Sequence, residues 1–237
     1  YSVNKLCSNI GSASNVWPGD CNYDFTVDNL DFLYLNIANG TSGTSRLSPS
    51  INWQAQPSTN WANYFANGAN YKHADCDGNG IVDSMDATAI YQNYNLQHTY
   101  SRFGNPAINS INPTFELKAV EDTITIGDTV HFEIRINSSG GSVDSLYGLA
   151  YSIEFDSSLI DSNYFNFDYS FSILDTTNNN IGSFNKKFFN YGYIDAAVSR
   201  TDHNNANNIS GVIGTINIKV KDSLPALCYL ILKPFLL

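Results

Sequence analysis

The chain has 237 residues, enough for one large domain or two ordinary ones, and 43% of them are hydrophobic, which excludes a globally disordered protein. Its net charge of −10 argues against a nucleic-acid backbone or an anionic membrane as partner. Only 14% of the residues are charged, and this weakly charged composition favours an extracellular β-protein over a cytosolic enzyme.

Apolar segments give no sign of a membrane span. No stretch of 18 or more apolar residues occurs, so we expect no transmembrane helix. The apolar segment 224–237 is broken by Pro225 and Pro234 and fits a buried strand pair better. The chain starts at Tyr1, without an initiator Met or a signal peptide. We interpret it as a mature or excised piece of a longer polypeptide, truncated in its last domain.

In chain order, residues 1–15 read as a linker or the end of a preceding domain, because they show no periodicity and contain Gly and Ser. Residues 16–99 hold an internal repeat with a period of 55 residues. Its two copies contain the acidic windows Asp20–Asp31 and Asp75–Asp86, and these hold eight of the 18 Asp residues. A helical pattern with one apolar face follows each window, over 30–37 and 87–94.

Each window has the ligand spacing of a twelve-residue calcium loop. Such a loop supplies oxygen atoms from positions 1, 3, 5, 9 and 12 and from the backbone carbonyl at position 7. In the second loop these positions are Asp75, Asp77, Asn79, Ile81 (carbonyl), Asp83 and Asp86. In the first loop they are Asp20, Asn22, Asp24, Thr26 (carbonyl), Asp28 and Asp31. The sequence therefore predicts two Ca²⁺ sites.

The two predicted sites differ at position 6, where the chain turns sharply with a positive φ. The second loop has Gly80 there, whereas the first has Phe25. A side chain in the left-handed region costs about 1 kcal/mol or more. We expect the first loop either to reshape its turn or to bind calcium more weakly. We also expect Val82, at position 8, to form a short β-bridge with the partner loop.

The four cysteines are Cys7, Cys21, Cys76 and Cys228, which permit three pairings. Cys21 and Cys76 occupy position 2 of the two loops. If the repeats pack about a pseudo-twofold axis, these two would form a disulfide; the alternative is four buried thiols.

Residues 100–237 consist of short apolar or alternating segments separated by Gly, Asn, Asp and Ser, the pattern of an antiparallel β-sandwich. The expected strands are 115–120, 123–126, 130–137, 146–155, 165–171, 187–189, 194–199, 212–220 and 228–234. The alternating aromatic residues of 165–171 indicate a core-facing strand, with a sugar-stacking platform as the alternative. The fold class is thus α+β and multidomain, with a small loop–helix calcium domain before the sandwich.

The position-12 Asp and the helix on the C-terminal side only are typical of one family. The segments Val16–Gly40 and Lys72–Leu96 resemble type I dockerin repeats. Phrases such as Val16–Asp20 and Asn52–Pro57 resemble large surface proteins of bacteria that use type IX secretion. Segments Leu146–Asp156 and Ala197–Asp202 resemble the cohesin-like, or jelly-roll, sandwich of those proteins.

This resemblance implies a secreted or cell-surface module of a multidomain adhesin or filament-forming protein. Its partners would be other surface-protein domains or further subunits, including self-assembly, with carbohydrate as another ligand class. Because no catalytic motif occurs, we expect no enzyme activity. The alternative function is a carbohydrate-binding or enzyme-associated accessory module.

Overall fold

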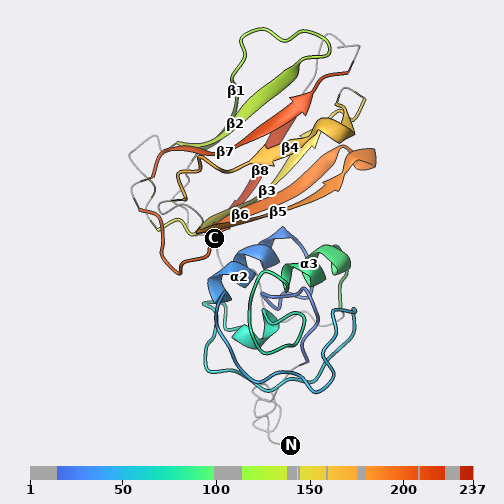
Figure 1. The fold of residues 1–237 in the computed structure, drawn as a ribbon, viewed down its shortest axis with the longest axis vertical. Helices are drawn as coiled ribbons and strands as arrows, with labels where there is room; N and C mark the ends of the chain where they lie inside the picture. Colours follow the sequence, from blue (N-terminus) through green and yellow to red (C-terminus); the bar gives the residue numbers. More distant parts are fainter. Residues whose placement is uncertain are drawn as a thin grey trace, which may run out of the picture. The chain divides into compact units, whose positions relative to one another are not determined.

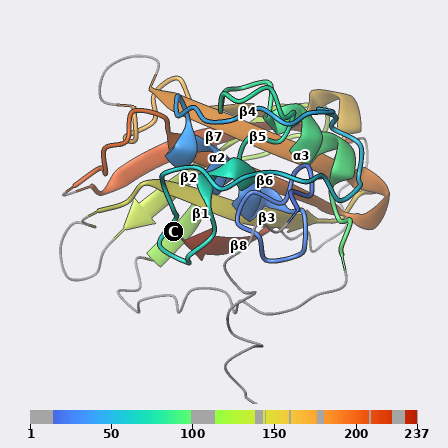
Figure 2. The same cartoon turned by 90° about the horizontal axis from the view of Figure 1, so that it is seen from below.

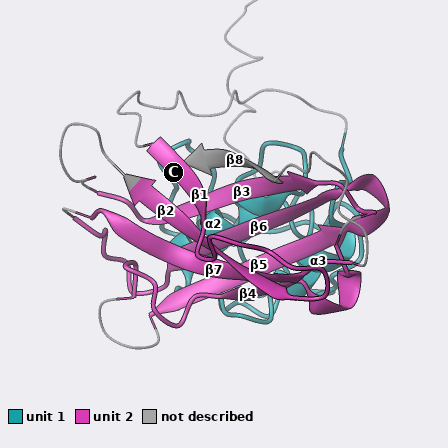
Figure 3. Ribbon diagram, turned by 90° about the horizontal axis from the view of Figure 1, so that it is seen from above, with its two compact units in different colours: residues 1–106 teal, residues 107–237 magenta. Residues whose placement is uncertain are grey.

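The chain divides into two compact units, residues 1–106 and 107–237 (Figures 1 and 3). The computed structural model describes residues 15–98, 114–137, 143, 145–158, 160–175, 180–207, 209–221 and, for the backbone, 230–236. The expected domain boundary at 99/100 and the cysteines Cys7 and Cys228 lie outside these residues. Within them, no helix is long and apolar enough to cross a bilayer.

Two helices follow the two acidic windows in unit 1 (Figures 1 and 2). Helix α2 spans Asn29–Ala38 and α3 spans Ala87–Asn93, and the two contact each other. The Asp28 side chain caps α2 by accepting a hydrogen bond from the Leu30 N–H, and Asp31 completes the capping box. The carboxylates that end the first loop therefore also start its helix.

The long connection between the repeats contains no helix or strand before the 3₁₀ turn η1 (Tyr71–His73). Asn70 organises its second half, because its amide group donates to the carbonyls of Trp61 and Asn63 and accepts from the Trp61 N–H. The connection contacts α3 where Asn93 donates to the Ile51 carbonyl at 2.8 Å. The connection therefore packs against α3 at this point.

Unit 2 is an antiparallel sandwich of two four-stranded sheets. One sheet has the order β1-β2-β7-β4 and the other β5-β6-β3-β8. The strands are β1 (Thr114–Ala119), β2 (Thr129–Asn137), β3 (Gly148–Phe155), β4 (Asn166–Asp168), β5 (Ile181–Phe188), β6 (Tyr193–Arg200), β7 (Gly211–Lys219) and β8 (Leu230–Leu236). Two 3₁₀ turns, η2 (Ser162–Tyr164) and η3 (Phe189–Tyr191), complete the unit.

The predicted strand at 123–126 is wrong. Its apolar residues Ile124 and Ile126 are exposed, and the backbone turns instead. Asp128 accepts from the Thr125 N–H at 3.1 Å, and Gly127 has a φ of +87°. The turn chemistry of Asp and Gly therefore overrides the alternation of apolar residues. Of the strand expected at 187–189, residues 187–188 form the end of the longer β5, and Phe189 begins η3.

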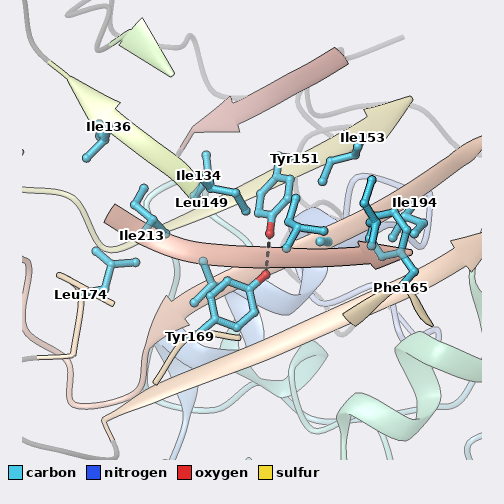
Figure 4. Packing of buried hydrophobic residues seen from close by; sticks show 14 of the residues in the cluster. Ile134, Ile136, Leu149, Tyr151, Ile153, Phe165, Tyr169, Leu174, Ile194 and Ile213 are labelled. Carbon is cyan, nitrogen blue, oxygen red and sulfur yellow. Dashed lines mark hydrogen bonds between the residues drawn. The ribbon is translucent and has the colours of Figure 1, made fainter. Parts of the chain in front are cut away.

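The sandwich core lies between the inner faces of the two sheets (Figure 4). Alternate residues of β3 and β6 enter it, among them Tyr151, Ile153 and Ile194. A register shift between β2 and β7 leaves Ile213 without a partner on β2, and Ile213 is buried with Ile216 in the core. Each such side chain contributes roughly 1.5–3 kcal/mol by leaving water.

Aromatic side chains of the segment around β4 mostly face this core, as expected from their alternation. Phe165 and Tyr169 are buried and Phe167 is partly buried, whereas Phe171 is 89% exposed in the turn that follows. A Cβ on Gly214 would approach the Tyr169 ring at 2.5 Å, so glycine makes room for that ring. The Tyr169 hydroxyl reaches the hydroxyl of Tyr151 from the opposite sheet (Figure 4).

This buried hydroxyl pair yields a prediction about the stability of the sandwich. Tyr151→Phe removes the partner of the Tyr169 hydroxyl and should lower the free energy of unfolding of unit 2 by about 1–3 kcal/mol. Tyr151→Phe/Tyr169→Phe should cost less than the sum of the two single variants, because no hydroxyl is left unpaired. Urea unfolding of the four chains, followed by circular dichroism, measures this; strict additivity would contradict it.

Candidate metal centre

The second acidic loop is shaped by its own expected ligands. The side chains of Asp77, Asn79 and Asp83 each accept a hydrogen bond from the backbone N–H two residues further on, at 2.7–2.9 Å. These are Asx turns, in which a short polar side chain fixes the local bend of the backbone. Positions 3, 5 and 9 thus make the turns of the loop, and they are also positions expected to supply oxygen ligands.

The first loop repeats this pattern 55 residues earlier. Asn22, Asp24 and Asp28 accept from the N–H groups of Asp24, Thr26 and Leu30 at 2.8–3.0 Å. The structure thus places the expected residues of both loops in equivalent conformations. The carbonyl-bearing residues at position 7, Thr26 and Ile81, each form an isolated antiparallel bridge, with Gln97 and Ser42 respectively.

The position-12 carboxylates close both loops. Asp86 accepts from the Asp77 N–H at 2.9 Å with one oxygen and from the Asp83 N–H at 2.9 Å with the other. Asp31 likewise accepts from the Cys21 N–H at 2.7 Å and the Asp28 N–H at 2.8 Å. Both carboxylates have no exposed surface. Each one holds the beginning of its loop against the end.

Three carboxylates converge in the second loop. Oxygen atoms of Asp75, Asp77 and Asp86 all lie within 4.8 Å of one another, and across the described residues no other three His, Cys, Asp or Glu side chains do so. Burial raises the pKa of Asp75 to about 6 and that of Asp86 to about 7. Clustered, buried carboxylates of this kind fit a hard divalent cation, whose charge offsets the cost of their desolvation.

The turn at position 6 distinguishes the loops. Gly80 has a φ of +92° in loop 2, and Phe25 has a φ of +82° in loop 1. The turn of loop 1 is therefore retained, and a non-glycine residue bears the left-handed conformation. Tyr23, at position 4, also has a positive φ of +57°. Such residues cost roughly 1–2 kcal/mol each, and burial of the Phe25 ring offsets part of this cost.

His98 is a residue of the first site that sequence reasoning missed. Its Nε2 atom lies 2.9 Å from Oδ2 of Asp20, and its ring stacks on Trp17 at 4.6 Å. Burial raises the pKa of Asp20, and the contact with His98 acts in the opposite direction. The four carboxylates of loop 1 form no cluster like that of loop 2 among the residues described. His73 is buried and stacks on Tyr23 at 4.2 Å, so it has a packing role.

Arg46 is the second unforeseen residue. It is buried, and its guanidinium donates to the backbone carbonyls of Asp75 at 2.5 Å and Cys76 at 2.8 Å. The backbone N–H of Arg46 donates to the Gly78 carbonyl. Arg46 therefore positions the first half of loop 2 from the connecting segment. No motif marks it, because the contact joins residues 29 and 30 positions apart.

The loops pair in a crossed manner, which corrects the expected bridge from Val82 to the partner loop. Val82 exchanges hydrogen bonds with Gly40 and Thr41, which follow α2 of the first repeat. Val27 exchanges them with Asn95 and Leu96, which follow α3 of the second. Each loop is thus tied to the end of the helix belonging to the other repeat. The two predicted sites are parts of one interlocked unit.

Comparisons with known proteins identify no family: no family model matches the chain, and no curated protein does. Solved structures of cohesins are similar to part of it. Type II cohesin A11 from Bacteroides cellulosolvens is 14% identical with a TM-score of 0.38, covering 47% of this chain and 71% of that one. A type I cohesin–dockerin complex from Clostridium thermocellum is 16% identical with a TM-score of 0.38. The match covers 48% of this chain and 78% of that one.

A second type II cohesin module, from an adaptor scaffoldin of Acetivibrio cellulolyticus, is 11% identical with a TM-score of 0.37. It covers 47% of this chain and 71% of its own. At these identities and TM-scores the likeness does not show that the chain belongs to the cohesins. The description of the two sheets above stands on the structure of this chain alone.

The raised pKa values of Asp75 and Asp86 predict how the calcium-free protein responds to pH. The folded state holds these protons more tightly than the unfolded chain, so their stabilising contribution is complete below about pH 4. It is lost as the pH rises through 6 and 7. In a chelator, unit 1 should therefore melt at lower temperature at pH 8 than at pH 5.

The matched control is Asp75→Asn/Asp86→Asn, which keeps His73. The pKa of His73 is lowered by burial, so its contribution has the opposite sign, and subtracting the profile of the variant removes it. Melting curves of both proteins between pH 5 and 8 measure the difference. Parallel profiles would contradict the prediction.

Gly80 yields a second prediction. A Cβ there would meet the Gly43 carbonyl oxygen at 2.9 Å, in addition to the strain of a positive φ. Gly68 has a similar φ of +87°, but its Cβ would meet nothing within 4 Å. Gly68→Ala should therefore show the backbone cost alone, about 1–2 kcal/mol. Gly80→Ala should cost more and should weaken calcium binding; equal losses of stability in the two variants would contradict this reasoning.

Proposed function

We propose that the chain is a non-enzymatic, calcium-binding structural module of a secreted or cell-surface multidomain protein. The observation that carries the proposal is the convergence of Asp75, Asp77 and Asp86 in a loop whose turns are made by its own ligands. Two ions would bind, one in each loop. The loop Asp75–Asp86 would be the stronger site, and Asp20–Asp31 the weaker one.

The donor set favours calcium over other divalent ions. Loop 2 would supply side-chain oxygen atoms from Asp75, Asp77, Asn79, Asp83 and Asp86, together with the carbonyl of position 7. Calcium takes six to eight oxygen ligands, whereas magnesium keeps several waters and uses few protein ligands. Zinc prefers sulfur and nitrogen ligands, and the two cysteine sulfur atoms, at position 2 of each loop, face each other.

The role of the ion would be to stabilise unit 1. Without the ion, each loop holds several carboxylates near one another, and burial opposes the ionisation of Asp31 and Asp86. A bound cation lowers the free energy of the folded state by mass action, about 2.7 kcal/mol when free calcium exceeds Kd a hundredfold. Extracellular calcium-binding modules have Kd values as weak as about 10⁻⁴–10⁻³ M.

The assembly role rests on other grounds. The dockerin-like loops, the phrases shared with type IX-secreted surface proteins and the weakly charged composition support an exported module in an adhesin or filament. Its partners would be neighbouring domains or further copies of the chain. The alternative, a carbohydrate-binding or enzyme-associated accessory module, calls for an aromatic platform. The segment around β4 does not supply one, since Phe165 and Tyr169 are buried.

Calcium titration of the full chain, first freed of calcium with a chelator, tests the proposal. We expect two binding events by calorimetry and a rise in the melting temperature of unit 1. Asp75→Ala should abolish the stronger event, and Asp20→Ala should weaken only the other one, because each removes a carboxylate from its own loop. The weaker event is assigned to loop 1 because that loop has the costlier turn. An intact stronger event in the Asp75→Ala chain would sink the proposal.

Asp122→Ala is the matched control, because this exposed aspartate belongs to unit 2 and is part of neither loop. It removes the same charge and should leave both binding events unchanged. Magnesium at the same concentrations should give little or no heat. A response to magnesium equal to that to calcium would assign the loops to divalent cations in general instead.

A further inference from the structure

Two cysteines meet at the centre of unit 1. Cys21 and Cys76 occupy position 2 of the two loops, 55 residues apart in the chain, and their sulfur atoms lie 3.3 Å apart. Both residues are thiols with no exposed surface. No exogenous reagent therefore reaches these sulfur atoms while the unit is folded, whereas each is in contact with the other.

The backbone around these cysteines holds the two calcium loops. The Cys21 N–H donates to the position-12 carboxylate of loop 1, Asp31, at 2.7 Å. The Cys76 carbonyl accepts from Arg46, which also holds the Asp75 carbonyl. A covalent bond between the sulfur atoms would thus join the closing contact of loop 1 to the first half of loop 2.

We propose that Cys21 and Cys76 form a disulfide that joins the two calcium loops. The sulfur atoms need to approach by about 1.3 Å to reach the bond length of about 2.05 Å. The two thiols lose two protons and two electrons, and the S–S bond forms. The acceptor is a disulfide, either of a thiol–disulfide oxidoreductase or of low molecular weight, whose S–S bond breaks to give two thiols.

The order of events follows from burial. Both sulfur atoms are fully buried in the folded unit, so an oxidant of either kind has no access to them there. Oxidation therefore takes place before the loops close or when they open. Once the loops have closed, the same burial shields the bond from reductants. An exported protein meets the oxidising conditions that this chemistry requires.

A consequence for calcium rests on the proposed function. Closing the loops around calcium hides the disulfide, and the disulfide in turn holds the loops in the binding conformation. By thermodynamic reciprocity, if calcium favours the disulfide, the disulfide raises calcium affinity by the same factor. We expect about tenfold tighter calcium binding in the oxidised chain, and reduction by a phosphine at least tenfold slower with calcium than with a chelator.

The first experiment looks for the bond in the full chain carrying Cys7→Ser/Cys228→Ser, which leaves one pair of cysteines. The protein is refolded with oxidised glutathione, denatured, alkylated and digested with trypsin. We expect peptide 6–46 cross-linked to peptide 73–102, with no alkylation of either cysteine until a reductant is added. In the native chain, peptide 6–46 holds both Cys7 and Cys21, so fragmentation of the cross-linked peptides is needed to show which of them is bonded, and a cross-link to the peptide of Cys228 shows competition by that residue.

The second experiment measures the coupling. Calcium affinity is compared for the oxidised chain, the reduced chain, and Cys21→Ala with and without Cys76→Ala. The rate of reduction of the oxidised chain is compared in calcium and in a chelator. Single and double alanine variants should bind calcium equally, at the reduced chain's affinity, because either one removes the bond. Circular dichroism of each variant confirms that unit 1 is folded.

The outcomes separate the two proposals. A chain that binds calcium while both cysteines stay open to alkylation after oxidative refolding overturns the disulfide and leaves the proposed function standing. A cross-linked chain that binds no calcium supports the disulfide and overturns the proposed function. Equal calcium affinities of the oxidised and reduced chains overturn the coupling.

Discussion

The closing of each acidic loop by its position-12 carboxylate is the contact on which unit 1 depends. Asp31 and Asp86 accept backbone N–H groups from both ends of their loops, and both are fully buried. A buried carboxylate is stable only when hydrogen-bonded, paired or coordinated. The hydrogen bonds meet part of this requirement, and a cation would meet the rest. Structure and ligand chemistry therefore share the same side chains.

Both loops make the same tight turn at position 6, but the conformational free-energy cost of the turn differs between them. Loop 2 makes its tight turn with Gly80, whereas loop 1 makes the same turn with Phe25 and buries the aromatic ring. Loop 1 also engages its first carboxylate, Asp20, with His98. The second repeat thus brings three carboxylates together, whereas in the first repeat Phe25 packs in the interior and Asp20 contacts His98. This difference is consistent with one strong and one weak site.

Sequence alone predicts what is coded within about a dozen residues. The spacing of the expected ligands and the helices after each loop were predictable because each pattern lies inside one short window of the sequence. Arg46 and His98 were not, since they reach the loops from 29 and 78 residues away. In unit 2, β5 begins at Ile181 within a polar stretch, and its pairing with β6 extends it beyond the predicted 187–189. There, neighbouring strands outweigh local preference.

The crossed pairing of the repeats has a consequence for how such a unit arises and how it can be divided. Val27 binds the backbone after α3, and Val82 binds the backbone after α2. A single half cut from the chain lacks the strand partner of its own loop. Two separate halves would therefore complement each other as fragments. The two halves must therefore come together before either loop is complete, because neither half supplies its own strand partner.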